Sequence, residues 1–191
     1  MPAADAQRWN ARYREREAQD QDPGPPRTFL VENVDVLPRC GWALDAAMGR
    51  GAAAGFLLRR GLNVIGVDIS TVAVNAARRT WPRLNAVVAD LTAFGLRDDS
   101  LDVIVNFYYL ERSLWPQYRR MLKPGGVLVI ESLSLEMLTV NPDVDPAYLL
   151  DAGELEQAFG DWEILARRAG WHTDTGHGSR ATRGLVVRRP L

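Results

Sequence analysis

Three aspartates end consecutive apolar segments of this sequence. Asp45 follows the apolar residues 42–44, Asp68 closes the segment 62–67, and Asp90 closes the segment 85–89. Short apolar segments of this length, separated by helix-like segments, predict strands of a parallel sheet, whose carboxyl ends meet at one edge. A carboxylate accepts hydrogen bonds from hydroxyls and amines and attracts a cationic group. We therefore expect the three carboxylates to meet at one ligand site.

A glycine-rich turn follows the first aspartate. Gly49 and Gly51 bracket Arg50, and the alanine-rich segment 52–60 begins directly afterwards. Glycine lets the backbone approach a ligand closely, and the helix N-terminus behind it favours negative charge. The run Gly-Arg-Gly-Ala-Ala-Ala fits the dinucleotide pattern G-x-G-x-x-A, so a nicotinamide-dependent oxidoreductase is one interpretation. Asp45 favours another, since its carboxylate would repel a pyrophosphate but suits the ammonium group of S-adenosylmethionine.

The second and third aspartates suit a nucleoside. Asp68 can accept hydrogen bonds from both ribose hydroxyls of either cofactor. Asp90 can accept from the exocyclic amine of adenine, and Leu91 offers a backbone N–H and an apolar face. The alternative is that these acids only cap helices or close turns, although Ser70 already provides an N-cap for the segment 71–81.

Composition restricts the classes of partner. The 191 residues carry a net charge of −1, with 47% hydrophobic and 25% charged residues. This balance predicts one globular domain (residues 1–191) without bulk attraction to nucleic acid or membrane. The N-terminal segment is polar, and no apolar run approaches the roughly 18 residues that cross a bilayer, so we expect a cytoplasmic protein. Cys40 is the single cysteine, expected in the core, and no His, Cys or acidic cluster has metal-ligand spacing.

The pattern of elements predicts an α/β fold with a doubly wound, seven-stranded, mostly parallel sheet. An N-terminal helix and linker (1–26) precede the core (27–191), which begins with a second helix. The last two strands lack a helix between them, so they form an antiparallel hairpin whose loop is the polar stretch 172–182. The expected helices are 4–18, 28–37, 52–60, 71–81, 113–122 and 154–161, and the expected strands are 42–47, 62–69, 85–91, 100–109, 127–133, 162–170 and 184–190.

The chain resembles a known family, the class I S-adenosylmethionine-dependent methyltransferases with their Rossmann-like fold. Within it, the chain is similar to the small bacterial tellurite-resistance-like branch. The resemblance covers about residues 8–190. It is carried by the motifs WNARY, LDAAMGRG, VIGVDIS, VVADL, FYYLERSLWP, LKPGGVLVIES and PAYLLDAGELEQAFGDWEIL, in this order.

The resemblance implies roles for individual residues. Near the sulfonium of S-adenosylmethionine it places Phe107 and Tyr108, and the N-terminal helix would form a lid over the pocket. Tyr108, Arg112 and Tyr13 are the catalytic candidates. The implied cofactor-binding residues are Trp9, Arg12, Asp45, Ala47, Gly49, Gly51, Asp68, Ile69, Asp90, Leu91 and Phe107.

Three positions depart from the family pattern. Ala47 stands where many methyltransferases have the first glycine of the turn, and Met48 stands where a small residue or cysteine is common. Glu111 precedes Arg112 where tellurite-type members tend to have histidine. Arg112 could bind an anionic substrate or pair with a neighbouring acid. The late arginines are expected on a solvated face: Arg180, Arg183, Arg188 and Arg189.

These observations favour a methyltransferase that uses S-adenosylmethionine and acts on a small molecule, either a thiol, a chalcogen oxyanion or a small oxygen or nitrogen nucleophile. A thiolate needs little activation, whereas a hydroxyl or protonated amine needs a general base. Two alternatives stay open: an NAD(P)-dependent oxidoreductase, weakened because the only lysine, Lys123, lies in a KPGG turn, and a non-catalytic cofactor-binding module. No nucleic-acid or membrane partner is expected, and the protein is expected to be a monomer or homodimer.

Overall fold

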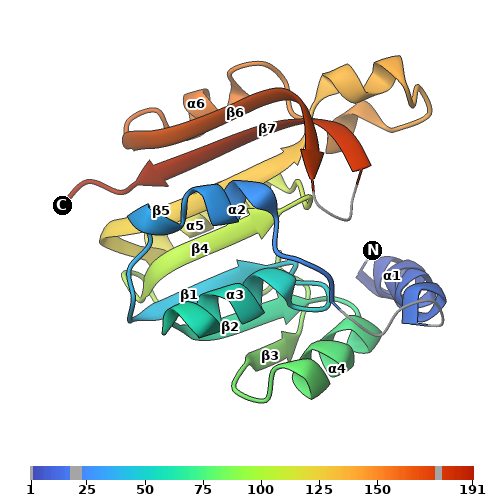
Figure 1. The fold of residues 1–191 in the computed structure, drawn as a ribbon, viewed down its shortest axis with the longest axis horizontal. Helices are drawn as coiled ribbons and strands as arrows, with labels where there is room; N and C mark the ends of the chain where they lie inside the picture. Colours follow the sequence, from blue (N-terminus) through green and yellow to red (C-terminus); the bar gives the residue numbers. More distant parts are fainter. Residues whose placement is uncertain (1, 18–22, 175–177) are drawn as a thin grey trace.

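The computed structural model describes residues 2–17, 23–174 and 178–191, and these form helices around one twisted sheet (Figure 1). The strands are β1 (Trp42–Ala46), β2 (Asn63–Asp68), β3 (Asn85–Val88), β4 (Leu101–Phe107), β5 (Leu122–Leu133), β6 (Glu163–Asp174) and β7 (Gly178–Arg188). The α-helices are α1 (Pro2–Glu17), α2 (Thr28–Glu32), α3 (Ala52–Arg60), α4 (Thr71–Thr80), α5 (Trp115–Met121) and α6 (Glu154–Phe159). The 3₁₀ turns are η1 (Val34–Val36), η2 (Arg112–Leu114), η3 (Leu135–Thr139) and η4 (Pro146–Tyr148).

The strand order is β3-β2-β1-β4-β5-β7-β6. β1 pairs in parallel with β2 on one side and with β4 on the other, so the direction of winding reverses between β1 and β4. β7 runs antiparallel to both β5 and β6. The predicted seven-stranded, mostly parallel sheet with an antiparallel terminal hairpin is confirmed.

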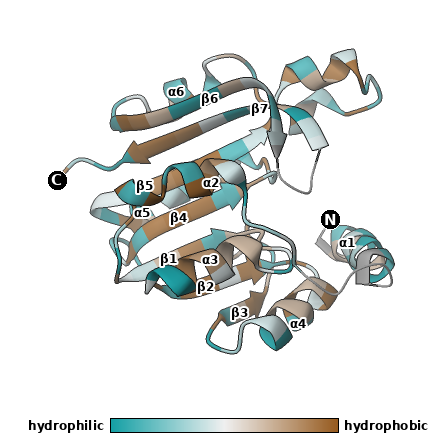
Figure 2. Cartoon of the chain, in the orientation of Figure 1, coloured by the Kyte–Doolittle hydropathy of each residue, from teal (hydrophilic) through white to brown (hydrophobic). Residues whose placement is uncertain are grey.

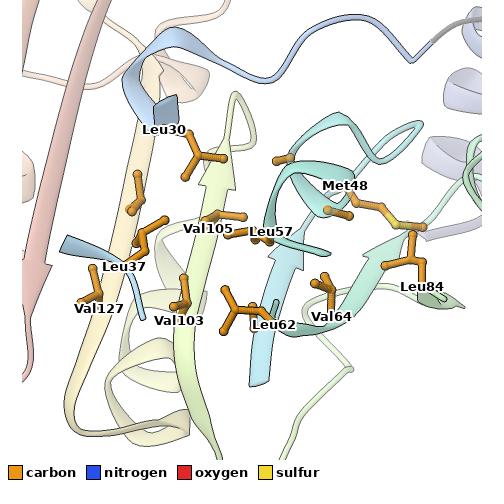
Figure 3. Close-up of a cluster of buried hydrophobic side chains, with 14 of the residues drawn as sticks. Leu30, Leu37, Met48, Leu57, Leu62, Val64, Leu84, Val103, Val105 and Val127 are labelled. Carbon is orange, nitrogen blue, oxygen red and sulfur yellow. The ribbon is translucent and has the colours of Figure 1, made fainter. Parts of the chain in front are cut away.

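Helices cover both faces of the sheet because successive strand residues point to opposite sides. On one face, Val103, Val105 and Val127 share a hydrophobic cluster with Leu30 of α2 and Leu57 of α3 (Figure 3). Val74 of α4 belongs to the same cluster. On the other face, Ile104 and Leu128 pack against α5 and α6. Figure 2 shows the hydrophobic colour concentrated on the central strands, which are therefore buried on both sides. Among the described residues, no helix is long and apolar enough to span a membrane.

The helix boundaries follow local chemistry at several predicted positions. Ser70 caps α4, since its Oγ accepts a hydrogen bond from the Ala73 N–H at 3.2 Å, as predicted. Gly61 ends α3 in the left-handed conformation. The predicted helix 28–37 is wrong in its second half. Asn33 ends α2 because its side chain donates to the Phe29 carbonyl at 2.8 Å, and only the short turn η1 follows.

Two further expectations are corrected. The stretch 172–182, expected as a loop, pairs within the β6–β7 hairpin over most of its length, with His172 opposite Arg180; residues 175–177 lie outside the described residues. Polar residues form strands there because an antiparallel pair can face water. Cys40, expected in the core, is exposed in the segment that leads into β1.

The amino ends of the strands are held together by the single lysine. Lys123 Nζ lies 2.9 Å from both carboxylate oxygens of Asp102, and the same carboxylate accepts a hydrogen bond from the Trp42 N–H at 2.7 Å. This ion pair joins the starts of β1, β4 and β5, at the edge opposite to the predicted ligand site.

Candidate active site

A cavity of about 540 Å³ opens at the carboxyl ends of the strands, around the point where the winding reverses. Its walls come from α1, from the segments that follow β1, β2, β3 and β4, and from residues before α2, at the end of β5, in η4 and in β7. This is the position where open α/β sheets bind their ligands, and the volume lies in the usual range for small-molecule sites.

Most of the predicted site residues line this cavity. Gly51 and Arg112 do not. The predicted residues in the wall are Trp9, Arg12, Tyr13, Asp45, Ala47, Gly49, Asp68, Ile69, Asp90, Leu91, Phe107 and Tyr108.

Asp45 is almost fully buried, with 3% of its surface exposed. Its Oδ2 accepts a hydrogen bond from the Ala54 N–H in α3 at 2.8 Å. Burial raises the pKa of Asp45 to about 7; the hydrogen bond from Ala54 lowers it and the charge of Asp68 raises it. The charge of this carboxylate therefore depends on whether a cation is present to stabilise it.

Asp68 links the glycine turn (residues 48–51) to the start of α4. Its Oδ2 accepts from the Gly49 N–H and its Oδ1 from the Ser70 N–H, both at 2.8 Å. Burial raises the pKa of Asp68, and these backbone hydrogen bonds oppose the shift. A carboxylate has about four lone-pair positions, so Asp68 can hold the turn and still accept hydroxyl protons from a ligand.

Asp90 both closes a turn and lines the cavity, as the two interpretations of its position predicted. Its Oδ1 accepts from both the N–H and the hydroxyl of Thr92, at 2.9 and 2.8 Å, which is a turn-closing arrangement. The residue nevertheless lines the cavity, beside the buried Leu91 and across from the wall residue Ile69 on the neighbouring strand end. Carboxylate and apolar surface therefore stand together at this end of the cavity.

Gly49 and Gly51 of the turn allow different close contacts. At Gly49 φ is +56°, and a Cβ there would lie 2.6 Å from the Tyr13 hydroxyl of α1. At Gly51 φ is +80°, and a Cβ would lie 3.1 Å from Trp81 Cδ1, away from the cavity. Gly49 thus allows α1 to approach the turn, whereas Gly51 allows α3 to pack closely on its neighbours. Gly51, which was predicted to bind the cofactor, does not line the cavity.

Helix α1 lies beside α4 and supplies one wall of the cavity (Figure 1). Trp9 and Tyr13, one turn apart, stack with ring centroids 6.1 Å apart, and the Arg12 guanidinium lies 5.1 Å from the Trp9 ring. The role of α1 as a lid stays a prediction.

The chain turns sharply where β4 ends. Tyr108 has φ +58°, in the left-handed region that non-glycine residues rarely adopt, and its N–H donates to the Glu131 carbonyl at 2.9 Å. Because the chain does not stay extended, Tyr108 and Tyr109 both line the cavity. Burial, followed by the charges of Glu111, Asp90, Asp5 and Asp68, raises the pKa of Tyr109 to about 12, so at neutral pH its hydroxyl can donate a hydrogen bond but is a poor base.

Arg112 acts outside the cavity. Its guanidinium binds both carboxylate oxygens of Glu154 and donates to the carbonyls of Ala147, at 2.8 Å, and Leu149, at 3.0 Å. Of the two interpretations left open, the ion pair is the one that the structure shows. Arg112 positions the segment that carries Tyr148. Tyr148 lines the cavity, whereas Arg112 itself does not.

Four arginines in the wall were not among the predicted site residues: Arg8, Arg27, Arg50 and Arg180. Arg180 was expected on a solvated face, and that prediction is wrong because β7 extends far enough to bring it to the cavity. Arg27 precedes α2 and lines the same wall. Both guanidinium groups lie over the Tyr108 ring, at 4.2 Å for Arg27 and 5.5 Å for Arg180. A basic residue in a polar stretch gave no sequence signal for this position.

Comparison with known proteins agrees with this geometry. Residues 43–126 match the family model described as a methyltransferase domain. A probable S-adenosylmethionine-dependent methyltransferase of Mycobacterium tuberculosis is 35% identical over 114 residues, which are 56% of this chain and 41% of the relative. A demethylmenaquinone methyltransferase of Renibacterium salmoninarum is 28% identical over 113 residues, 56% of this chain and 47% of the relative. The alignments span less than half the length of these curated relatives.

Solved structures show the same fold. A crystal structure of an S-adenosylmethionine-dependent methyltransferase from Methanosarcina mazei superposes with a TM-score of 0.69 at 17% identity, covering 83% of this chain and 96% of that one. A structure from work on disulfide-to-thioacetal conversion in echinomycin biosynthesis reaches a TM-score of 0.73 at 20% identity, over 97% and 91% of the two chains. Residues 43–126 are therefore similar to a methyltransferase domain, and the chain has the same Rossmann-like fold as solved S-adenosylmethionine-dependent methyltransferases.

Proposed function

We propose that the chain binds S-adenosylmethionine in the cavity and transfers its methyl group to a small-molecule acceptor. One observation carries the proposal: Asp45, Asp68 and Asp90, from three consecutive strand ends, line a single cavity beside a glycine turn. Carboxylates suit the ammonium group, the ribose hydroxyls and the adenine amine of this cofactor, and they disfavour a pyrophosphate.

The remaining wall residues fit the same cofactor. Arg50 lines the cavity, and its buried Nε has no hydrogen-bond partner among the described residues, so a ligand carboxylate would satisfy it. Ile69 and Leu91 offer apolar surface for a base. Trp9, Arg12 and Tyr13 would cover the bound molecule from α1.

The cofactor supplies a methyl group on a cationic sulfur, which a nucleophile can displace in line. The task of the protein is to orient the two reactants and to exclude water. Phe107 and Tyr108 provide the wall nearest to the end of β4, and Tyr13 lies close to the glycine turn. Thiols, which need little activation, belong among the acceptors to be tested.

The oxidoreductase alternative loses support. An oxidoreductase with a Tyr-x-x-x-Lys pair would need a lysine near the reacting atoms, and the single lysine is paired with Asp102 at the opposite edge of the sheet. The resemblance to the tellurite-resistance-like branch stays a prediction from the motifs. For that reason, chalcogen oxyanions should be among the acceptors that are tested. Among the described residues no group of His, Cys, Asp and Glu could hold a metal ion.

Isothermal calorimetry with S-adenosylmethionine, S-adenosylhomocysteine and NADH tests the proposal. We expect micromolar binding of the first two, lost in Asp68→Ala and weakened in Asp90→Asn. Arg120→Gln, which alters an exposed ion pair with Asp98, is the matched control and should bind normally. Binding of NADH alone would overturn the proposal. Binding of the cofactor without methyl transfer to any thiol, phenol, amine, selenite or tellurite would favour the non-catalytic module.

A further inference from the structure

The cavity has a second chemical region beside the one that carries the three aspartates. Its wall contains Arg27 before α2, Tyr108 after β4, Leu133 at the end of β5, Tyr148 of η4 and Arg180 of β7. These residues come from the half of the sheet that holds β4, β5 and β7, whereas the aspartates come from the half that holds β1, β2 and β3. We call the part of the cavity with the three aspartates the acidic region, which Arg12 and Arg50 also line, and the second region has basic and aromatic side chains without an aspartate.

The two arginines of this region converge on one ring. The guanidinium carbon of Arg27 lies 4.2 Å from the centroid of the Tyr108 ring, and that of Arg180 lies 5.5 Å from it. A guanidinium is attracted to an aromatic face. Both arginines line the cavity, so they bring positive charge to the same part of its wall.

Tyr108 is held toward the cavity at a conformational cost. Its φ of +58° is left-handed, which destabilises a non-glycine residue by about 1–3 kcal/mol. The hydrogen bond from its N–H to the Glu131 carbonyl fixes the turn. Strained residues concentrate at binding and catalytic sites, and here the strain places an aromatic ring under two cations.

We propose that the methyl acceptor is a small acid, whose carboxylate or phosphate group binds to Arg27 and Arg180 while its carbon skeleton packs beside Tyr108. This inference rests on the proposed function, because it assigns the acidic region to the cofactor. Arginine presents a planar fork of N–H donors that matches both carboxylate and phosphate. Leu133 and Tyr108 add apolar surface, which favours an acid with an aromatic or hydrophobic skeleton.

The test uses the full chain loaded with S-adenosylhomocysteine and two probes, benzoate and phenyl phosphate, followed by ligand-observed NMR. Benzamide is the neutral counterpart of benzoate. We expect at least one acid to bind at least tenfold more tightly than benzamide. We expect Arg27→Gln and Arg180→Gln each to weaken acid binding at least tenfold, with S-adenosylhomocysteine affinity changed less than threefold. Arg188→Gln, on the same strand as Arg180 but outside the cavity wall, alters an ion pair with Glu163 and should behave as the unaltered chain.

The outcomes separate this inference from the proposed function. Equal binding of benzoate and benzamide, or unchanged acid binding in both glutamine variants, overturns the acid subsite. Loss of S-adenosylhomocysteine binding in those variants also overturns it, because the arginines would then hold the cofactor. Failure of the unaltered chain to bind S-adenosylmethionine or S-adenosylhomocysteine is a different result and overturns the proposed function.

Discussion

Asn10 of α1 accepts a hydrogen bond from the Ser70 hydroxyl at 2.7 Å and so anchors α1 to the first turn of α4. The same Asn10 oxygen also accepts from the Val72 N–H at 3.2 Å and from the Thr71 hydroxyl at 3.3 Å. Since Ser70 N–H in turn donates to Asp68, the lid position and the predicted ribose-binding carboxylate are joined through one residue.

Asn10→Ala is expected to weaken S-adenosylmethionine binding about three- to tenfold, the value of one or two lost hydrogen bonds. The reason is that α1 carries Trp9 and Tyr13 to the cavity. Calorimetry measures the effect. Asn10→Asp is the control, because it keeps the acceptor oxygen that all three donors use, and it should retain most of the affinity. Normal affinity in the alanine variant would show that other contacts position the lid.

Asp45 is expected to make the ligand-free protein less stable as the pH rises. Its pKa is about 7 when folded and near 3.8 when unfolded, so between these values the folded state holds a proton that the unfolded state has lost. The contribution to the free energy of unfolding is complete below about pH 4 and disappears as the pH passes 7, with an upper limit on the order of 4 kcal/mol.

Urea denaturation between pH 4.5 and 8 measures this contribution against Asp45→Asn, which keeps an acceptor for the Ala54 N–H. The free energy of unfolding of the unaltered chain should fall relative to that of the variant as the pH rises. Two parallel pH profiles would mean that Asp45 ionises normally in the folded protein.

Gly51→Ala is expected to lower the free energy of unfolding by about 1–3 kcal/mol. The left-handed φ of +80° strains any L-residue, and the new methyl group would contact Trp81. Gly95→Ala is the control, since Gly95 has no such φ and nothing lies within 4 Å of its Cβ position. Equal stabilities of the two variants at the same pH would contradict the structural role assigned to Gly51.

Arg112→Met is expected to loosen the segment 147–154. The variant loses hydrogen bonds to Glu154 and to two backbone carbonyls, and because the side chain is partly exposed we expect a cost of only about 1–2 kcal/mol. Limited proteolysis around Tyr148 measures the change, with Arg120→Met as the control for an exposed, loosely paired arginine. Cleavage at the same rate in both variants would show that Arg112 does not hold this segment in place.

The contribution of the Arg112–Glu154 ion pair to stability is expected to depend on pH. Burial opposes the shift, but the hydrogen bond from Arg112 and the Asp151 backbone lower the pKa of Glu154. This contribution to stability is therefore present above the unfolded pKa of about 4.3 and is lost as the pH falls through the lower folded value.

The sequence allowed prediction of those site residues that follow strands. Asp45, Asp68 and Asp90 end apolar segments, and parallel pairing necessarily brings such ends together. Contacts between distant segments were not predictable, because nothing in the sequence around Arg112 indicates Glu154, which lies 42 residues away. The position of Arg180 depended on how far a polar hairpin continues to pair.

Cys40 gives the molecule a chemical handle of its own. It is the single cysteine of the sequence, it is exposed, and it precedes β1, whereas the cavity opens at the opposite ends of the strands. A thiol-reactive tag would therefore attach at one point, and coupling to a sensor surface through that point would leave every molecule with its cavity facing the solution.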